Sequence, residues 1–241
     1  MKITVLTLFP ELFAGVISTS VIARSREKGI VSTEFVQIRD FSTDIHRRVD
    51  DTPFGGGAGM VMTCQPLFDA IKSVRKENSH VVLLSARGVP YTQKKAHELA
   101  KKEHLILLCG HYEGVDERVA GLCDEEISVG DYVLTGSEPG AIIIMDSVIR
   151  LLPGAIRNES IEEESYENGL LEYPQYTHPA VYEGMAVPEV LLSGHHENIR
   201  KWRLLQSLKR TREVRPDLYE AHEFTKEEKK LAMKLEEEEE A

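Results

Sequence analysis

The sequence predicts an α/β fold with a mostly parallel sheet over its first 150 or so residues. Short apolar runs alternate there with segments of helical periodicity, which is typical of parallel strands joined by helices. The apolar runs are short and nearly continuous, as in buried strands. The predicted strands are 2–9, 80–86, 105–110 and 125–130, and the predicted helices are 66–77, 92–104 and 139–154.

Each predicted element follows from its own residues. The segments "KITVLTLF", "HVVLLSA", "LILLCG" and "EEISVG" are the ones that we expect to form buried strands. The helices "PLFDAIKSVRKE" and "TQKKAHELAKKEH" combine an apolar stripe with a charged outer face. The helix "PGAIIIMDSVIRLLPG" is mostly apolar and is closed by Pro-Gly, a pair that stops helices.

The composition changes after residue 157. Residues 158–179 are acidic, aromatic and interrupted by proline without a sustained period, which indicates an interdomain linker. The predicted organisation is an α/β domain over 1–157, this linker, and a small all-helical domain over 180–241. We expect residues 158–172 to be disordered until a ligand binds, because glutamates dominate them and no period orders them.

Helical spacing returns in the last third of the chain. Ile199, Trp202, Leu205 and Leu208 recur at intervals of three and predict a core-facing stripe, whereas arginines occupy another face of the same helix. A final helix is expected from Thr225, because Thr and a Glu three residues later form the pattern of a capping box.

Composition excludes several classes of protein. The formal net charge of -11 argues against a protein that coats nucleic acid without specificity. The 3 cysteines have no metal-ligand spacing, so we expect neither a disulfide framework nor a zinc site. No apolar run approaches the roughly 18 to 20 residues of a membrane helix, and the first residues lack the apolar region of a signal peptide. We therefore expect a cytoplasmic protein without a membrane partner.

Glycine-rich loops are the candidate binding elements. The loop "SVGDYVLTGSEPG" over 128–140 lacks the Gly-Lys-Ser/Thr ending of a phosphate loop, so it suits a compact, largely uncharged group that is bound by main-chain amides. The loops "LLSARG" and "LLCGHYEG" also follow strands and would join it in one pocket if the strands are neighbours. The glycine cluster at 50–60 is either a flexible surface loop or a loop whose backbone lies against a planar ligand or a nucleic-acid backbone, with Arg47 and Arg48 as phosphate contacts.

These segments together resemble a known family. "LFPELF", "PFGGGAGM", "CGHYEGVDERV", "SVGDYVLTGSE" and "SGHHENIRKWR", in this order and spacing, are similar to bacterial tRNA (guanine-N(1))-methyltransferases of the SPOUT class. The resemblance covers nearly the whole chain. It implies a trefoil-knotted α/β domain, a helical C-terminal domain and a homodimer with its active site at the subunit interface. The substrate that it implies is the guanine immediately 3′ of a tRNA anticodon.

The resemblance also assigns a cofactor site. It implies S-adenosylmethionine as methyl donor, with backbone groups of 129–134 at the adenine. Ser137 departs from the glycine that the family more often has, and we expect little effect. The residues assigned to the cofactor are Leu84, Ser85, Gly110, Tyr112, Glu113, Gly114, Ser128, Val129, Gly130, Asp131, Tyr132, Val133, Leu134, Gly136 and Pro139.

Two residues match the family's catalytic positions. Glu164 stands where the family has its aspartate base, and the longer glutamate side chain is a departure; Glu162 and Glu163 are its local competitors, and a solvated acidic linker is the alternative. Arg150 matches the arginine that would stabilise negative charge on the guanine oxygen, and its alternative is a cation at a helix carboxyl end.

The predicted RNA contacts come from several parts of the chain, and a basic face that is merely solvated is their alternative. A magnesium ion accompanies activity in the family, but no motif marks a site for it. The rival functions are a knotted methyltransferase for another RNA position and a noncatalytic tRNA-binding protein. The residues predicted to contact RNA are Arg47, Arg48, Gly59, Ser165, Arg200, Arg203, Lys209, Arg210 and Arg212.

Overall fold

The computed structural model describes residues 1–157 and 164–240, without the side chains of 234 and 236–240. The chain divides into two compact units, Met1–Arg157 and Asn158–Ala241. Each unit is described by itself.

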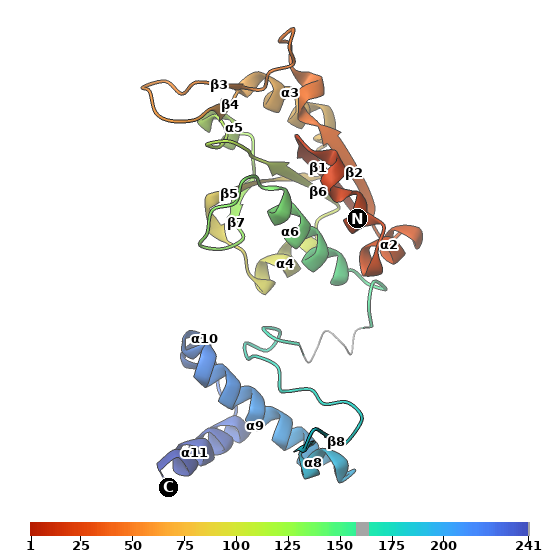
Figure 1. Cartoon of the computed structure of the whole chain (residues 1–241), viewed down its shortest axis with the longest axis vertical. Coiled ribbons are helices and arrows are strands. Elements are labelled where there is room, and N and C mark those ends of the chain that lie inside the picture. The colour runs from red at the N-terminus through yellow and green to blue at the C-terminus, as the bar shows by residue number, and fades with distance from the viewer. Residues whose placement is uncertain (158–163, 241) are drawn as a thin grey trace. The chain divides into compact units, whose positions relative to one another are not determined.

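The first unit contains a five-stranded parallel sheet with the order β2-β1-β6-β5-β7 (Figure 1). Every residue of β6, the middle strand, is buried, which explains the apolar run that follows His104. The strands are β1 (Lys2–Thr7), β2 (Ser32–Gln37), β5 (Ser79–Pro90), β6 (His104–Cys109) and β7 (Glu125–Ser128). A separate pair is formed by β3 (Asp50–Asp51) and β4 (Val61–Met62).

Helices cover both faces of this sheet (Figure 1). One core packs the sheet against α2 (Ser20–Glu27), α4 (Gln93–Ala100) and α6 (Glu138–Arg150). The other core packs it against α3 (Cys64–Val74) and α5 (Glu117–Ala120). The short elements η1 (Pro10–Phe13), α1 (Ala14–Ile17) and η2 (Ile38–Phe41) complete this unit. The predicted α/β class, with a parallel sheet, is confirmed.

The predicted strands and helices of the first unit all appear, but β2, α2 and the shorter elements β3, β4, α1 and α5 were not predicted. β2 is an edge strand with the sequence "STEFVQ", in which four of the six residues are polar, so it has no apolar run to mark it. The conformation of β2 is instead set by its parallel pairing with β1.

The buried start of α6 is tied to β1 by a hydrogen bond. The Oγ1 atom of Thr7 donates to Oε1 of Glu138 over 2.7 Å, and the backbone N–H of Phe9 donates to the same Oγ1 over 2.9 Å. Glu138 is only 2% exposed. The Thr7 hydroxyl therefore satisfies two buried polar groups at once.

We expect Thr7→Val to lower the free energy of unfolding by about 2 kcal/mol, because it leaves these two groups without their hydroxyl partner. Chemical denaturation measures the change. The matched control is Thr33→Val, because the buried Oγ1 of Thr33 has no hydrogen-bond partner among the described residues. The control should be neutral or slightly stabilising, and an equal loss in both variants would contradict the role given to Thr7.

The second unit is built around the long helix α9 (His196–Val214). Leu208 of α9 packs with Leu170 and with Leu235 of α11 (Lys226–Glu240). The predicted capping box is confirmed, since Thr225 N–H donates to Glu228 Oε2 over 2.6 Å and Glu228 N–H donates to Thr225 Oγ1 over 3.3 Å. The remaining helices are α8 (Glu189–Leu192) and α10 (Pro216–Ala221).

The structure corrects the prediction of helices alone over 180–241. The strands β8 (Val181–Tyr182) and β9 (Met185–Ala186) pair as an antiparallel hairpin. Its two turn residues, Glu183 and Gly184, have φ values of 50° and 80°. Positive φ at both central positions is what a tight hairpin turn requires.

Part of the predicted linker belongs to the second unit. Leu170 is 1% exposed, and the backbone N–H of Leu171 donates to Thr211 Oγ1 of α9 over 2.9 Å. Residues 164–172 therefore have defined contacts in the structure, which differs from the disorder expected over 158–172. The rest of that expectation concerns 158–163, which lie outside the described residues.

Candidate functional site

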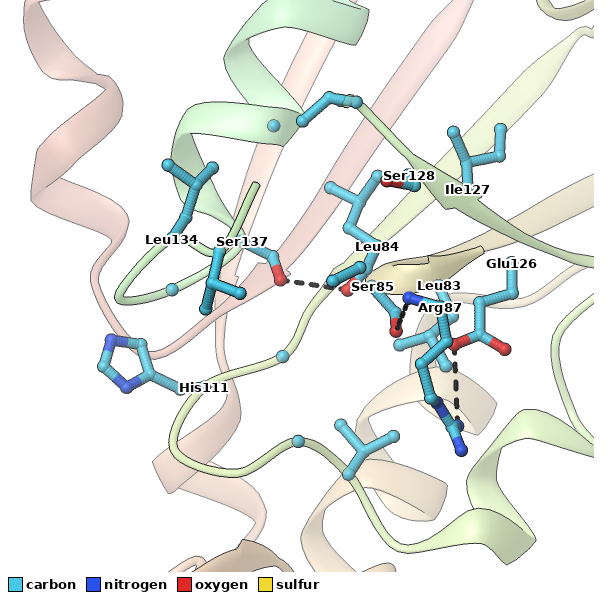
Figure 2. Close-up of a pocket in the computed structure, with 18 of the residues that line it drawn as sticks. Leu83, Leu84, Ser85, Arg87, His111, Glu126, Ile127, Ser128, Leu134 and Ser137 are labelled. Atoms are coloured by element: carbon cyan, nitrogen blue, oxygen red, sulfur yellow. Dashed lines mark hydrogen bonds and ion pairs between the residues drawn. The ribbon is translucent and has the colours of Figure 1, made fainter. Parts of the chain in front are cut away.

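A pocket of about 360 Å³ lies at the carboxyl ends of β5, β6 and β7 (Figure 2). These three strands are neighbours in the sheet, and the pocket is lined by residues 83–87 of β5 and by the glycine-bearing loops that follow β6 and β7. The predicted convergence of the three segments is confirmed, but "LLSARG" belongs to β5 and its Gly88 does not line the pocket. This edge of a parallel sheet is where α/β proteins generally bind ligands.

Most of the residues predicted to bind a cofactor line this pocket. Asp131 and Pro139 do not: both are exposed, and Gly140 lines the pocket where Pro139 was expected. The predicted residues that the pocket brings together are Leu84, Ser85, Gly110, Tyr112, Glu113, Gly114, Ser128, Val129, Gly130, Tyr132, Val133, Leu134 and Gly136.

Ser137 fastens the loop before α6 to two strand ends. Its backbone N–H donates to the Gly110 carbonyl over 3.0 Å, and its Oγ donates to the Leu84 carbonyl over 2.9 Å. Figure 2 shows this side chain between the loop and the end of β5. The hydroxyl that departs from the family's usual glycine therefore contributes a hydrogen bond to the pocket wall.

Gly136 allows close approach of two pocket loops. It pairs with His111 in an antiparallel bridge. A Cβ atom at Gly136 would lie 2.4 Å from Cδ2 of His111 and 2.6 Å from Oε2 of Glu138. Only glycine fits at this position without displacing its neighbours.

A charged group at the pocket was missed by sequence reasoning. Arg87 lies in β5, and its Nη2 is 3.6 Å from Glu126 Oε1 (Figure 2). The same Nη2 is 3.0 Å from Glu117 Oε2. The hydrogen bond to Glu117, followed by the charge of Glu126, raises the pKa of the guanidinium. The position of Arg87 directly after the predicted strand 80–86 was the available signal. Other lining residues that were not predicted include His111, Ile127 and Thr135.

The glycine cluster at 50–60 adjoins the pocket through Gly59. A Cβ atom at Gly59 would lie 2.3 Å from Oε1 of Glu113, so the two residues are in close contact. The backbone N–H of Glu113 donates to the Met60 carbonyl over 3.0 Å, and that of Met62 donates to the Gly114 carbonyl over 2.9 Å. This end of the loop is therefore held against the pocket and is not a free surface loop.

Arg47 and Arg48 lie before this loop, and each pairs with a carboxylate. Arg47 Nη2 contacts Asp40 Oδ1, and Arg48 Nη2 lies 3.0 Å from Asp44 Oδ2. The hydrogen bond from Arg48 lowers the pKa of Asp44 to about 2. Such exposed pairs contribute little to stability, so both guanidinium groups can exchange their partners for phosphate at low cost.

The predicted RNA contacts of the second unit centre on α9. Lys209 and Arg210 are exposed, Arg200 pairs with Glu197 and Glu227, and the Arg203 guanidinium lies over the ring of Tyr173 at 4.7 Å. Ser165 is in the preceding loop, where its Oγ accepts a hydrogen bond from the backbone of Glu172 over 3.0 Å. Arg212 is a half-buried residue of the same helix.

The two candidate catalytic residues belong to different units. Arg150 is the last residue of α6 in the first unit, and Glu164 opens the loop 164–172 in the second. Both side chains are half-buried. The competitors Glu162 and Glu163 lie outside the described residues.

The described residues contain no cluster of three or more His, Cys, Asp or Glu side chains that could hold a metal ion. The three cysteines are free thiols in the structure. No helix in the described part of the chain is long and apolar enough to cross a membrane.

A parallel sheet that carries a glycine-lined pocket at the carboxyl ends of its strands defines an α/β protein built to bind a small ligand there. Comparison with known proteins identifies the family. The family model described as tRNA (Guanine-1)-methyltransferase TrmD matches residues 1–221. This chain belongs to that family.

Three relatives illustrate the similarity, and each is named tRNA (guanine-N(1)-)-methyltransferase. The protein from Halalkalibacterium halodurans is 56% identical over 236 residues, which cover 96% of both chains. The protein from Clostridium botulinum strain Kyoto is 56% identical over 233 residues, 96% of this chain and 97% of its own. The protein from Dictyoglomus turgidum is 51% identical over 239 residues, 99% of this chain and 98% of its own. The chain is accordingly an enzyme that methylates guanine in tRNA.

Proposed function

We propose that the pocket binds S-adenosylmethionine and that the enzyme methylates ring nitrogen 1 of the guanine immediately 3′ of the anticodon. The observation that carries the proposal is the convergence of residues 83–87 of β5 with the glycine-bearing loops that follow β6 and β7. When bound, the cofactor supplies an electrophilic methyl group.

The pocket lining suits such a cofactor. Leu84, Ile127 and Val129 offer apolar surface to an adenine ring, and the main chain of 129–134 offers N–H and C=O groups to its edge. Gly136 keeps the opposite wall free of a side chain. A site of this kind binds a neutral base without a phosphate-binding lysine.

We assign the proton transfer to Glu164. Ring nitrogen 1 of guanine carries a proton and is a poor nucleophile until that proton leaves, so a positioned carboxylate is the group required. Arg150 has the complementary role. Its guanidinium is permanently charged and planar, and it stabilises the negative charge that develops on the neighbouring guanine oxygen.

The proposal includes the architecture that the family resemblance implies. The chain forms a trefoil knot around the pocket loops, and residues of the C-terminal helical unit contact tRNA.

We further propose a cytoplasmic homodimer with its active site at the subunit interface. Exposed apolar side chains at the pocket loop and on α6 support a second copy as partner, since Val133 is 89% exposed and Ile143 is 42% exposed. Whether magnesium takes part is left to the assay below.

Methyl transfer from labelled S-adenosylmethionine to tRNA transcripts tests the proposal. The substrate pair is a transcript with guanine directly 3′ of the anticodon and the same transcript with adenine there. We expect label only in the first transcript. Each reaction is run with and without added magnesium. Equal labelling of both transcripts would show that another nucleotide is the acceptor.

We expect Gly136→Ala to weaken cofactor affinity by about 10-fold or more, because the added methyl group pushes His111 and Glu138 out of place. Isothermal titration with S-adenosylmethionine measures the affinity. Gly121→Ala is the control, since a Cβ there meets nothing closer than the Arg118 carbonyl at 3.4 Å, outside the pocket lining. If Gly136→Ala binds S-adenosylmethionine as tightly as the wild type, the cofactor binds at another site.

A further inference from the structure

The second unit has a pocket of its own. It has a volume of about 310 Å³ and lies between the chain segment 173–180 and the helices α8 and α9. Aromatic rings and a guanidinium make up much of its wall. We call it the aromatic pocket and define it by Tyr173, Tyr176, Trp202 and Arg203.

The rings of this pocket are arranged around a space. Tyr176 and Trp202 have ring centroids 6.3 Å apart and planes inclined by 53°, so they do not stack on each other. The Arg203 guanidinium lies over Tyr173 at 4.7 Å. Tyr176 is 49% exposed, which leaves much of its ring open to an incoming ligand. A planar ligand is the natural partner of such walls, because every nucleobase has a π-face for aromatic rings and guanidinium planes.

The basic face of α9 continues from this pocket. Lys209 and Arg210 are exposed, and each lies seven residues after Trp202 and Arg203 respectively, so the four share one side of the helix. Seven residues of helix advance by about 10 Å. A nucleotide whose base enters the pocket therefore has cations two turns away for its neighbouring phosphates. The pocket also holds polar groups for a base edge, in Gln175, Thr177 and His178.

We propose that the aromatic pocket binds one unpaired nucleobase of the tRNA substrate, a different base from the guanine that is methylated. The proposal rests on tRNA being the substrate. It gives the second unit a role in reading single-stranded RNA, in addition to phosphate contacts. The chemistry favours RNA over a peptide, since stacking surfaces and cations occur together.

Trp202 provides a direct probe, because it is the only tryptophan of the chain. We expect its fluorescence to fall when the full-length protein is titrated with tRNA transcript. The titration is repeated with transcripts that carry an abasic residue at one unpaired anticodon-loop position at a time. We expect the quenching to be lost when one particular nucleotide, other than the guanine that is methylated, is abasic. If no single abasic substitution reduces the quenching, no base enters the pocket and the proposal fails.

Tyr176→Ala tests the energetics. We expect tRNA affinity at constant salt to fall by about 5- to 100-fold, the range for loss of one stacked base, and Tyr176→Phe to retain affinity within about 2-fold. Tyr182→Ala is the matched control, since Tyr182 is an exposed tyrosine of the same unit outside the pocket. The loss in Tyr176→Ala should disappear with the transcript that is abasic at the identified position. A Tyr176→Ala protein that binds intact tRNA as tightly as the wild type would overturn the proposal.

The failure of this proposal can be told apart from failure of the proposed function. Cofactor affinity of Tyr176→Ala, measured by calorimetry, should equal that of the wild type, which shows that the first unit is folded. An unchanged far-UV circular dichroism spectrum shows that the helices of the second unit are retained. The wild type could transfer no methyl group and yet lose its fluorescence quenching with a transcript that is abasic at one position. That result would support the base-binding role of the aromatic pocket and contradict the proposed methyl transfer. If methyl transfer is normal and Tyr176→Ala changes nothing, only the pocket proposal falls.

Discussion

Replacing Glu164 with glutamine, or Arg150 with alanine, is expected to slow methyl transfer by two orders of magnitude or more, while cofactor binding is retained. Glutamine keeps the shape of the side chain but cannot accept a proton, and general base catalysis of this kind contributes about 10²–10⁴-fold. Loss of a cation at a developing oxyanion has an effect of about 10²–10³-fold. Single-turnover transfer from labelled S-adenosylmethionine measures both.

Three further variants sharpen this experiment. Glu162→Gln and Glu163→Gln test the neighbouring carboxylates of the same acidic run, and both should transfer the methyl group at the wild-type rate. Glu164→Asp restores the residue type of the family and should retain much of the rate. If Glu164→Gln is as fast as the wild type while Glu163→Gln is slow, the base is one residue earlier in the chain.

Gly88→Ala is expected to have the largest effect on the first unit. Gly88 lies in β5 where the register with β7 shifts between Leu84 and Val89. A Cβ atom there would lie 2.4 Å from the backbone carbon of Ile127 and 2.5 Å from its nitrogen. Backbone atoms of a paired strand cannot rotate away as a side chain can, so β7 must move. We expect a loss of about 3 kcal/mol or more in unfolding free energy.

The same variant should lose cofactor binding, because Ser85 and Arg87 within the register shift of β5, and Ile127 of β7, line the pocket. Denaturation and calorimetry measure the two effects. Gly15→Ala is the control, since a Cβ at Gly15 meets nothing within 4 Å. A Gly88→Ala protein with the stability of the control would mean that the strands tolerate a wider separation there.

The sequence was most informative where hydrophobic burial decides the structure. The buried apolar residues of β1, β5 and β6 identified these strands in the sequence, and their pairing as neighbours brings the pocket segments together. β2 could not be predicted in this way, because an edge strand with polar residues takes its conformation from a partner that is distant in sequence.

The candidate site was predictable only in part for a similar reason. Glycine positions and the family resemblance led to thirteen of the fifteen residues assigned to the cofactor, and these line the pocket. The contacts of Arg87 with Glu117 and Glu126 depend on how a helix and a strand are placed in three dimensions. The aromatic pocket likewise arises because the segment 173–180 lies along α9, which no local pattern specifies.

The hydrogen bond between Thr7 and Glu138 joins residues 131 positions apart, and the pocket is lined by segments that end only at Gly140. Native contacts of such long sequence separation form slowly, because loop closure must precede them. During synthesis, most of the first unit must therefore emerge from the ribosome before the cofactor site can form. Until then β1 and β6 present apolar faces that α6 will later cover, and the nascent chain is at its most vulnerable to aggregation.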